Sequence, residues 1–531
     1  MLMGFVPFSV LFVSISFTPQ NRGGLDTQKH LTATIQSHWR QGNCAQAVAM
    51  AEYAFTWFPD HPATWKSLVM ILLAQGKWPN AQLALQQALS LSPADKALQL
   101  WAQGLLFLVR EPVPQHALAL RGLADAMLIE ASPEDAENVA WIAMRQGIRE
   151  PWVDVCRAQA LWRQKLRDAA MAVLHDAIAH RPAAEFWLAL AQFEIERHEF
   201  SHAIEILRTG LTQFPDDATL AVLMCSTCLN AGDLMAAKAS IERLLDVQPD
   251  HPEALTQRGV VSMRLGYYRD AITHFREAMS VMLAQGKAPP ARPCDMTGFD
   301  SEHNQALMWS TLAQLSNKGV HAFPMAGTLL GLIRDGRLLP FDKDLDFGVP
   351  WAEMALAVEC LQANGWVEHC GSYGLNNPRA FRHLASGMVL DLCGLETAPG
   401  GDQMLGGFWM GRSPGTDDRV TVFPRIDLVL EQRAAGSVWM PVNAEAVLTA
   451  LYGDWRTPDP DFDTVIGAKN LRDFSPLTHC YALLRILGRW QQGHLAKARA
   501  LLLHTLKYVP DDVLLGRVQA HLQVSHMKSL P

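Results

Sequence analysis

A proline recurs at a nearly constant spacing along much of the chain, and this spacing constrains the fold more than any other feature. Pro59 and Pro93 are 34 residues apart, and Pro182, Pro215 and Pro249 follow one another at intervals of 33 and 34 residues. A helix usually ends before a proline, because the proline ring disfavours the α conformation of the preceding residue. The period therefore predicts a helical unit of this length that repeats along the chain.

A second marker stands 17 positions before each of these prolines. The residues at this position are Gly42, Gly76, Lys165, His198 and Gly232, and Gly266 opens a further unit. A residue that tolerates left-handed or turn geometry ends one helix there, and an alanine-rich amphipathic helix follows, as in GDLMAAKASIERLL. Two helices per unit, stacked on their neighbours, predict an α-solenoid. The same spacing returns near the end of the chain, between Gly493 and Pro510.

This pattern resembles the tetratricopeptide repeat family. The resemblance covers about residues 33–100 and 150–290, whereas residues 101–150 are helical in period but do not follow the register. Such a resemblance implies that the repeats bind a partner protein, and a purely structural scaffold is the alternative.

Composition narrows the function classes. The formal net charge of −8 argues against a broad basic surface, so no nucleic-acid partner is expected. The nine cysteines are irregularly spaced, which indicates reduced thiols rather than a disulfide framework or a zinc cluster. Leu2–Phe17 is a mostly apolar run that Pro7 interrupts, and we interpret it as a flexible terminus, with a signal or membrane anchor as the alternative. We expect a cytoplasmic protein, with membrane association as the alternative.

The period stops after Met282, and the composition and hydrophobic pattern of the sequence change. QGKAPPARPCDMTGFD indicates a linker, and after one more helix glycine becomes frequent, strand-like alternation appears and acidic residues cluster. The chain is therefore predicted to be multidomain, with an α-solenoid plus an α/β (α+β) domain that has a mixed sheet. The predicted segments are an apolar terminus (1–27), helical repeats (28–284), a linker (285–300), the α/β domain (301–475) and returning repeat helices (476–531).

Acidic residues alternate along one predicted strand, LLPFDKDLDFGV. Alternate side chains of a strand share a face, so Asp342, Asp344 and Asp346 are expected to point the same way, and the apolar residues between them point into a core. Adjacent carboxylates repel one another and need either a cation or full solvation. Hard oxygen ligands of this kind suit Mg²⁺ or Mn²⁺, and an exposed acidic strand edge is the alternative.

Two further features accompany this strand. Asp391 interrupts a second apolar strand in VLDLCG, where a bound metal would explain a buried charge, and Asp427 in PRIDLVLE is the runner-up. Upstream, Gly327 and Thr328 begin a short helix whose free N–H groups would attract phosphate, and Arg334 on the same segment can pair with a phosphate oxygen.

The order of these parts, GT, then DLDF, then LDL, resembles the nucleotidyltransferase superfamily related to DNA polymerase beta. GTLLGLIRDGRLLPFDKDLDFGV narrows the resemblance to the LicD family of choline-phosphate transferases, which includes fukutin-related proteins. VWMPVNAEAVLTALYGDWRTPDP fits the end of the family pattern, so the resemblance covers about residues 305–470. The chain departs from the pattern at Asp335, Phe341 and Lys343, and Lys343 places a cation between the carboxylates.

The resemblance implies a reaction and a set of site residues. Asp344, Asp346 and Asp391 would be catalytic, and together with Asp342 they would bind Mg²⁺ or Mn²⁺. A CDP-activated donor, such as CDP-choline or a CDP-polyol, would pass its phosphocholine or polyol-phosphate group to a hydroxyl group of a glycan, as in a cell-surface polysaccharide. The residues expected to bind the substrate or its phosphates are Gly327, Thr328, Arg334, Arg382, His383 and Lys469.

Two other interpretations of the chain stay open. One is a repeat scaffold with a degenerate, inactive transferase domain, which Lys343 would favour. The other is nucleotidyl transfer to a protein or a small molecule. Single residues also have alternatives: His383 fits a packed or surface histidine, and Tyr452 and Trp455 fit core packing as well as stacking on a base.

Overall fold

The structure is a computed structural model. It describes residues 31–529, apart from 32–33, 36, 40–42, 59, 111–112, 287–300, 341–343, 369–373 and 460–461. The predicted terminal segment 1–27 and nearly all of the predicted linker lie outside the described residues. The chain divides into two compact units, Met1–Arg197 and His198–Pro531.

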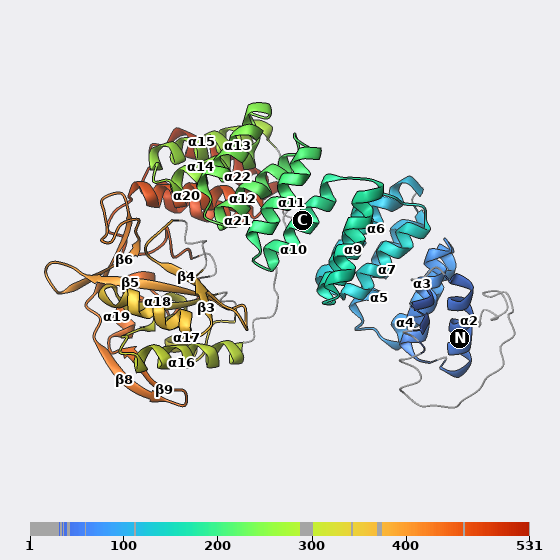
Figure 1. Cartoon of the computed structure of the whole chain (residues 1–531), viewed down its shortest axis with the longest axis horizontal. Coiled ribbons are helices and arrows are strands. Elements are labelled where there is room, and N and C mark those ends of the chain that lie inside the picture. The colour runs from blue at the N-terminus through green and yellow to red at the C-terminus, as the bar shows by residue number, and fades with distance from the viewer. Residues whose placement is uncertain are drawn as a thin grey trace. The chain divides into compact units, whose positions relative to one another are not determined.

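The first unit consists of consecutive antiparallel helices (Figure 1). They are α2 (Cys44–Trp57), α3 (Pro62–Ala74), α4 (Trp78–Leu91), α5 (Lys96–Arg110), α6 (Val113–Glu130), α7 (Pro133–Arg145), α8 (Pro151–Arg163), α9 (Arg167–His180) and α10 (Ala184–Glu196). Residues 101–150, which do not follow the repeat register, nevertheless form α5, α6 and α7 and share one core with their neighbours.

The spacing marker of the sequence coincides with a specific backbone conformation. Among the described marker positions, the glycines are Gly76, Gly232, Gly266 and Gly493, with φ between 70° and 81°. Lys165 and His198 occupy the same position with φ of 64° and 61°, although they carry side chains. Each marker thus ends one helix in the left-handed region and lets the next helix turn back.

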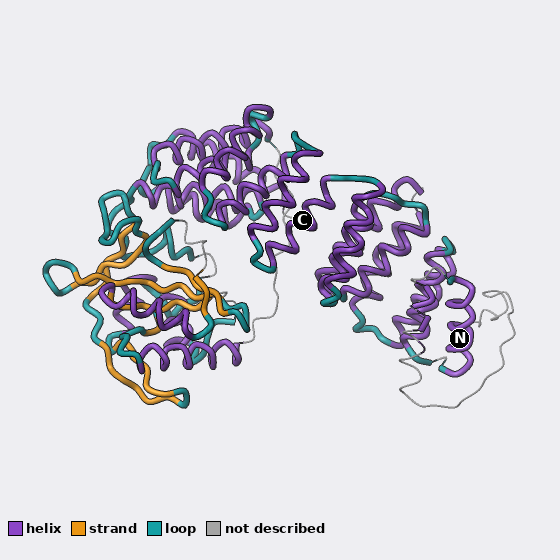
Figure 2. Tube along the Cα trace, in the orientation of Figure 1, coloured by secondary structure: helices purple, strands orange, loops and turns teal. Residues whose placement is uncertain are grey.

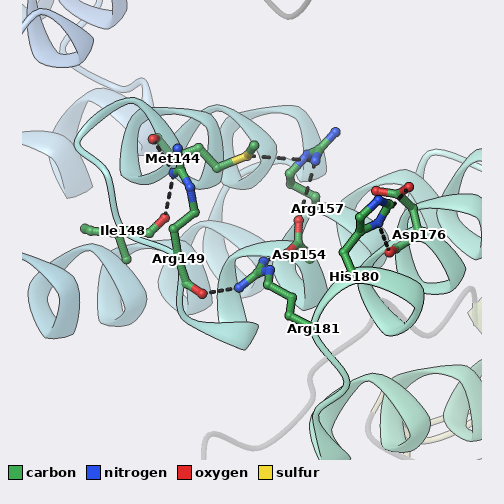
Figure 3. Close-up of polar contacts among 8 residues, drawn as sticks. All are labelled: Met144, Ile148, Arg149, Asp154, Arg157, Asp176, His180 and Arg181. Carbon is green, nitrogen blue, oxygen red and sulfur yellow. Dashed lines mark hydrogen bonds and ion pairs between the residues drawn. The ribbon is translucent and has the colours of Figure 1, made fainter.

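Arginines tie neighbouring helices of the first unit together around the start of α8 (Figure 3). Arg181, which follows α9, donates to the carboxylate of Asp154 and to the backbone carbonyl of Arg149. Arg149 in turn donates to the carbonyl oxygens of Met144 (2.7 Å) and Ile148 (3.1 Å). Asp154 is only 8% exposed, so this paired charge belongs to the scaffold of the repeats.

The second unit contains a helical array that is interrupted by an α/β domain (Figure 2). Its helices are α11 (Phe200–Gln213), α12 (Ala218–Asn230), α13 (Leu234–Val247), α14 (Pro252–Arg264), α15 (Tyr268–Gln285), α20 (Pro476–Gln491), α21 (Leu495–Leu506) and α22 (Val513–Ser529). Helix α20 packs against α14 and α15, with hydrogen bonds from Gln491 Nε2 to Thr256 Oγ1 (3.0 Å) and from Cys480 Sγ to the Tyr268 carbonyl (3.4 Å). The α/β domain is therefore an insertion between two neighbouring helices of the array.

The inserted domain is built on a mixed seven-stranded sheet. Strand β1 (Phe323–Pro324) pairs with β2 (Asp344–Pro350), β2 runs parallel to β5 (Val389–Thr397), and β4 (Arg379–His383) and β3 (Trp366–Glu368) follow in antiparallel order. β6 (Gln403–Phe408) joins β5 to β7 (Arg419–Pro424), and β8 (Leu428–Arg433) and β9 (Gly436–Pro441) form a separate hairpin. This confirms the predicted combination of a TPR-like helical region and a domain with a mixed sheet.

The two faces of the central strands differ in character. Leu345 and Phe347 of β2 and Leu390 and Leu392 of β5 are all buried on one face, where α16 (Ser301–Asn317) and α18 (Met354–Ala363) cover them. A short 3₁₀ turn, η2 (Trp351–Glu353), joins β2 to α18. On the flank of the other face, α17 (Ala326–Arg334) and α19 (Ala444–Tyr452) pack on each other and contact β2 and β7 respectively. The alternate residues of β2 and β5, which include the aspartates, therefore face away from the apolar core.

The cysteines include one Cys-x-x-Cys pair, Cys225 and Cys228, which the interpretation of their spacing as irregular overlooked. Both are free and buried on α12, and burial raises the pKa of Cys225 to about 12 and that of Cys228 to about 11. They are therefore unreactive core thiols. As for the membrane, no helix formed by the described residues combines the length and apolar character that a membrane span needs.

Candidate active site

Three of the predicted aspartates come together on adjacent parallel strands. Asp346 of β2 lies directly opposite Asp391 of β5 in the strand register, and Asp344 lies two residues before Asp346 on the same face. All three side chains line a cavity of about 690 Å³. The prediction that Asp344 and Asp346 share a face, with Leu345 and Phe347 directed into the core, is met by β2, whereas Asp342 lies outside the described residues.

The carboxylates lie close enough together to affect the ionisation of their neighbours. Burial, and then the nearby Asp344 carboxylate, raise the pKa of Asp391 to about 7. Cys393, the next residue on the same face of β5, has a pKa far above the ordinary value, because it is buried and then because Asp346, Asp391 and Asp344 are close. These shifts indicate that a positive charge at the aspartates would be favourable.

The predicted Gly-Thr helix start supports Asp346. The Gly327 amide donates to Asp346 Oδ2 (3.1 Å), and the Asp346 amide donates to Thr328 Oγ1 (2.8 Å). The sequence had suggested that Thr328 contacts a phosphate. Thr328 is instead completely buried and lies behind the aspartate. Gly327 still lines the cavity beside Ala326, whose φ of 43° is left-handed. The start of α17 therefore fixes the direction of the Asp346 side chain.

Cationic side chains line the same cavity. Two of them, Arg334 and Lys469, were predicted from the sequence. Arg334 also pairs with Asp335 (3.0 Å and 3.2 Å), which lowers the pKa of that carboxyl. Two others were missed: Arg419, at the start of β7, and Arg485, in the middle of α20. Arg485 stands in the apolar helical run CYALLRILG, the same kind of setting that drew attention to Asp391, but only the packing of α20 shows which surface it reaches.

Three candidates lie away from the cavity. Arg382 belongs to β4 and lies on the same sheet face as the aspartates, but it does not line the cavity. His383 packs against Trp366 and its Nδ1 is 2.9 Å from Ser386 Oγ, in agreement with the packed-histidine alternative. Asp427, the runner-up ligand, has a 63% exposed side chain that pairs with Arg425.

Two aromatic side chains, Tyr452 and Trp455, complete one wall. Trp455 is 5% exposed and its Nε1 donates to Thr449 Oγ1 (3.1 Å), while the Arg456 guanidinium lies 4.2 Å from its ring centroid. Trp455 thus combines core packing with a cavity-facing surface. Both roles considered for it from the sequence are compatible with this position.

The donor set suits a hard divalent cation, although it is not a closed cage. Within the described ranges, no group of three or more His, Cys, Asp or Glu side chains is arranged to hold a metal ion by itself. Mg²⁺ is commonly bound by one or two carboxylates together with substrate phosphates, not by an all-protein cage. Oxygen donors from Asp344, Asp346 and Asp391, whose proximity helps to raise the pKa of Asp391 and that of Cys393, fit that mode of binding.

Comparison with known families agrees with this architecture. The family described as "LicD/FKTN/FKRP, nucleotidyltransferase domain" matches residues 319–374, which include α17 and β2. The tetratricopeptide repeat family matches residues 32–96, 157–218 and 229–281. The chain fuses a LicD-type domain to tetratricopeptide repeats. Asp391, Arg419 and Arg485 lie beyond the residues that match the LicD family.

The LicD-type match implies a phosphotransferase-like role, and the tetratricopeptide repeats imply binding to proteins. The comparison with curated proteins found no match. Among solved structures, MamA from Desulfovibrio magneticus RS-1 is 18% identical, with 32% of this chain and 97% of that chain covered and a TM-score of 0.25. A tetratricopeptide repeat protein from Parabacteroides merdae is 16% identical, with 48% and 93% covered and a TM-score of 0.26. Neither likeness is close enough to add to the argument.

Proposed function

We propose that the LicD-type domain is a metal-dependent transferase. It moves a phosphocholine or polyol-phosphate type of group from a CDP-activated donor to a hydroxyl group of a glycan or a related acceptor. The observation that carries the proposal is the meeting of Asp344, Asp346 and Asp391 in one cavity, from two parallel strands, beside a match to the LicD family. The repeats supply a surface for a protein partner.

The proposed reaction needs positive charge around the phosphate groups of the donor. The bond between the transferred phosphorus and the CMP oxygen breaks and CMP leaves. A new phosphorus–oxygen bond forms to the acceptor, and the proton of the acceptor hydroxyl passes to the surrounding water. A divalent ion held by Asp344, Asp346 and Asp391 would neutralise charge on the phosphate oxygens. Arg334 and Lys469, which line the same cavity, would bind the remaining phosphate oxygens.

The cavity also has features that suit a nucleotide. At about 690 Å³ it is within the usual range for a small-molecule site, and Tyr452 and Trp455 offer flat apolar surface on one wall. We infer that the cytosine ring stacks on this wall and that the diphosphate extends toward the aspartates. Gly327 and Thr328 act through Asp346, because Gly327 holds its carboxylate and Thr328 holds its backbone amide.

The test combines donor binding with turnover on the full-length chain. Purified protein is incubated with Mg²⁺ or Mn²⁺ and a panel of CDP-linked compounds, and thermal stability and CMP release are followed. A donor that is used should raise the Tm more when the metal is present than when it is absent. The Asp344→Asn and Asp346→Asn variants should lose CMP release by a factor of about 100 or more, because they keep the shape of the side chain but remove its charge.

Asp427→Asn is the matched control, since this carboxylate belongs to the same domain but is exposed and lies outside the cavity. It should behave as the unaltered protein does. CMP release that survives in both Asp344→Asn and Asp346→Asn would place the reaction elsewhere. A complete lack of metal-dependent donor binding would instead favour the inactive scaffold.

A further inference from the structure

One short loop holds two arginines that come from different parts of the second unit. The Thr464 and Val465 carbonyl oxygens accept hydrogen bonds from Nη2 and Nε of Arg419, both at 2.7 Å. The adjacent Asp463 carboxylate accepts from Nη1 of Arg485 at 2.5 Å. Arg419 begins β7 of the inserted domain, whereas Arg485 belongs to α20 of the helical array. The loop therefore joins the two guanidinium groups across the boundary between the domain and the array.

The loop itself is firmly held. Oδ1 of Asp463 accepts hydrogen bonds from the Val465 and Ile466 amides, both at 3.0 Å, and the Asp463 carbonyl accepts from the Gly467 amide at 2.7 Å. Because its two oxygens have separate partners, the Asp463 carboxylate is fixed in direction. The position of Arg485 is consequently determined by the loop and by its own helix.

Positive charge is in excess at this point. Arg419 is only 4% exposed, and its two hydrogen bonds go to neutral carbonyl oxygens through Nε and Nη2, so neither of them uses Nη1. Asp463 is one carboxylate for two guanidinium groups. Burial, followed by the nearby Arg485, lowers the pKa of Arg419 to about 10, so it is still charged at neutral pH. Arg485 has a 39% exposed side chain, but its charge lies close to the buried Arg419, and this is unfavourable for Arg419 unless an anion joins the two.

Both arginines line the cavity that holds the aspartates. Arg419 is close enough to Cys393 to oppose the rise in the pKa of that thiol, and Cys393 lies two residues beyond Asp391 on the same strand face. Two residues along a strand span about 7 Å, which is on the scale of one phosphate group beyond the aspartates. Lys469 lines the cavity as well. The cationic side chains of the cavity therefore come from several elements and not from α17 alone.

We propose that Arg419 and Arg485 form an anion subsite that binds a phosphate group of the substrate. Helix α20, a member of the helical array, then supplies part of the substrate-binding site of the inserted domain. This inference rests on the proposed function for the identity of the substrate, but not for the binding of the anion. Planar guanidinium groups bind phosphate oxygens through paired hydrogen bonds, which a lysine at the same place would not reproduce.

The test measures anion binding without metal. The full-length chain is titrated with inorganic pyrophosphate in the presence of EDTA, by calorimetry at low ionic strength. The unaltered protein should bind, and Arg485→Ala should weaken binding at least about tenfold, since one charge-assisted contact is lost. Arg485→Lys should give a smaller loss, and it serves as the second variant if Arg485→Ala does not fold. Arg489→Ala is the matched control, because Arg489 is one turn further along α20 but exposed and outside the cavity.

The outcomes separate this proposal from the transferase proposal. Asp346→Asn should keep or strengthen pyrophosphate binding without metal, because it removes a negative charge from the cavity. Failure of pyrophosphate to bind the unaltered protein would overturn the subsite, as would equal losses in Arg485→Ala and Arg489→Ala. Neither result would bear on metal-dependent CMP release, which Asp344 and Asp346 test separately.

Discussion

Asp346 and Asp391 lie directly opposite each other on the parallel strands β2 and β5. The two carboxylates thus share one face of the sheet at neighbouring positions, with Asp344 close by. A folded protein keeps such a cluster at a cost in stability, because like charges repel and burial removes water from them. This cost gives the site a signature that can be measured before any substrate is known.

Replacing Asp391 by Asn should stabilise the metal-free protein. The pKa of Asp391 is raised from its ordinary value to about 7, so the charged form is disfavoured in the folded state. The unfolded chain releases the proton at lower pH, so the stability of the unaltered protein should fall as the pH rises from about 4 to about 7 and then level off. Asp391→Asn should lack this slope and gain up to about 4 kcal/mol at pH 8.

Urea denaturation at pH 5 and pH 8, with EDTA, measures this difference. Asp427→Asn, at an exposed carboxylate, should change neither the stability nor its pH dependence. An Asp391→Asn variant that is less stable than the unaltered protein at pH 8 would contradict the prediction.

Thr328 should matter for stability through its hydroxyl group alone. Thr328→Val keeps the shape of the side chain but leaves the Asp346 amide without its acceptor, which should cost about 1–3 kcal/mol. Thr328→Ser keeps the acceptor and should cost less. Thermal denaturation of the two variants side by side distinguishes the loss of the hydrogen bond from a loss of packing. Equal stability of the two would mean that the bond is unimportant.

Gly331 should not tolerate a methyl group. A Cβ at this position would lie 2.6 Å from the Arg337 carbonyl oxygen and 2.9 Å from the Leu339 amide, where the chain folds back over α17. Gly331→Ala should therefore destabilise the domain by about 1–3 kcal/mol. Gly516→Ala on α22 is the control: it meets nothing within 4 Å and should be neutral or slightly stabilising. A neutral Gly331→Ala would show that the segment after α17 moves easily.

Lys165 offers the opposite change, a stabilising one. Its φ of 64° is left-handed, a conformation that glycine adopts without strain. Lys165→Gly should stabilise the first unit by about 1 kcal/mol, whereas Lys165→Ala should bring no such gain because alanine also has a Cβ. Thermal denaturation decides between them, and a similar gain for both substitutions would point to the loss of the lysine charge as the cause.

Local patterns account for what the sequence predicted. The repeat marker at Gly76 or Lys165 reflects a helix end that lies within a few residues of it, and the alternation around Asp344 reflects a single strand. Asp391 stood out because an isolated acid in an apolar strand is unusual. Features of this kind depend on neighbours along the chain, and a sequence displays them directly.

What the sequence did not predict depends on packing between distant segments. Thr328 was expected to face a phosphate, but α17 packs so that its hydroxyl meets the backbone of β2. Arg485 was placed in a returning repeat helix, and nothing near it in the chain shows that α20 reaches the aspartate cavity. Likewise, one loop accepts hydrogen bonds from both Arg419 and Arg485, and these bonds form only when β7, α20 and the loop are packed together.

The chain returns from the inserted domain to the helical array at α20. The domain and the array therefore cannot be separated without damage to one of them. A fragment that stops at residue 475 would lose the helix carrying Arg485 and with it one wall of its own pocket. A fragment that starts at residue 301 would keep that helix but uncover the side that normally rests on α14 and α15. Excision at either border should yield an incomplete molecule, so the second unit is the smallest piece that can be expected to work alone.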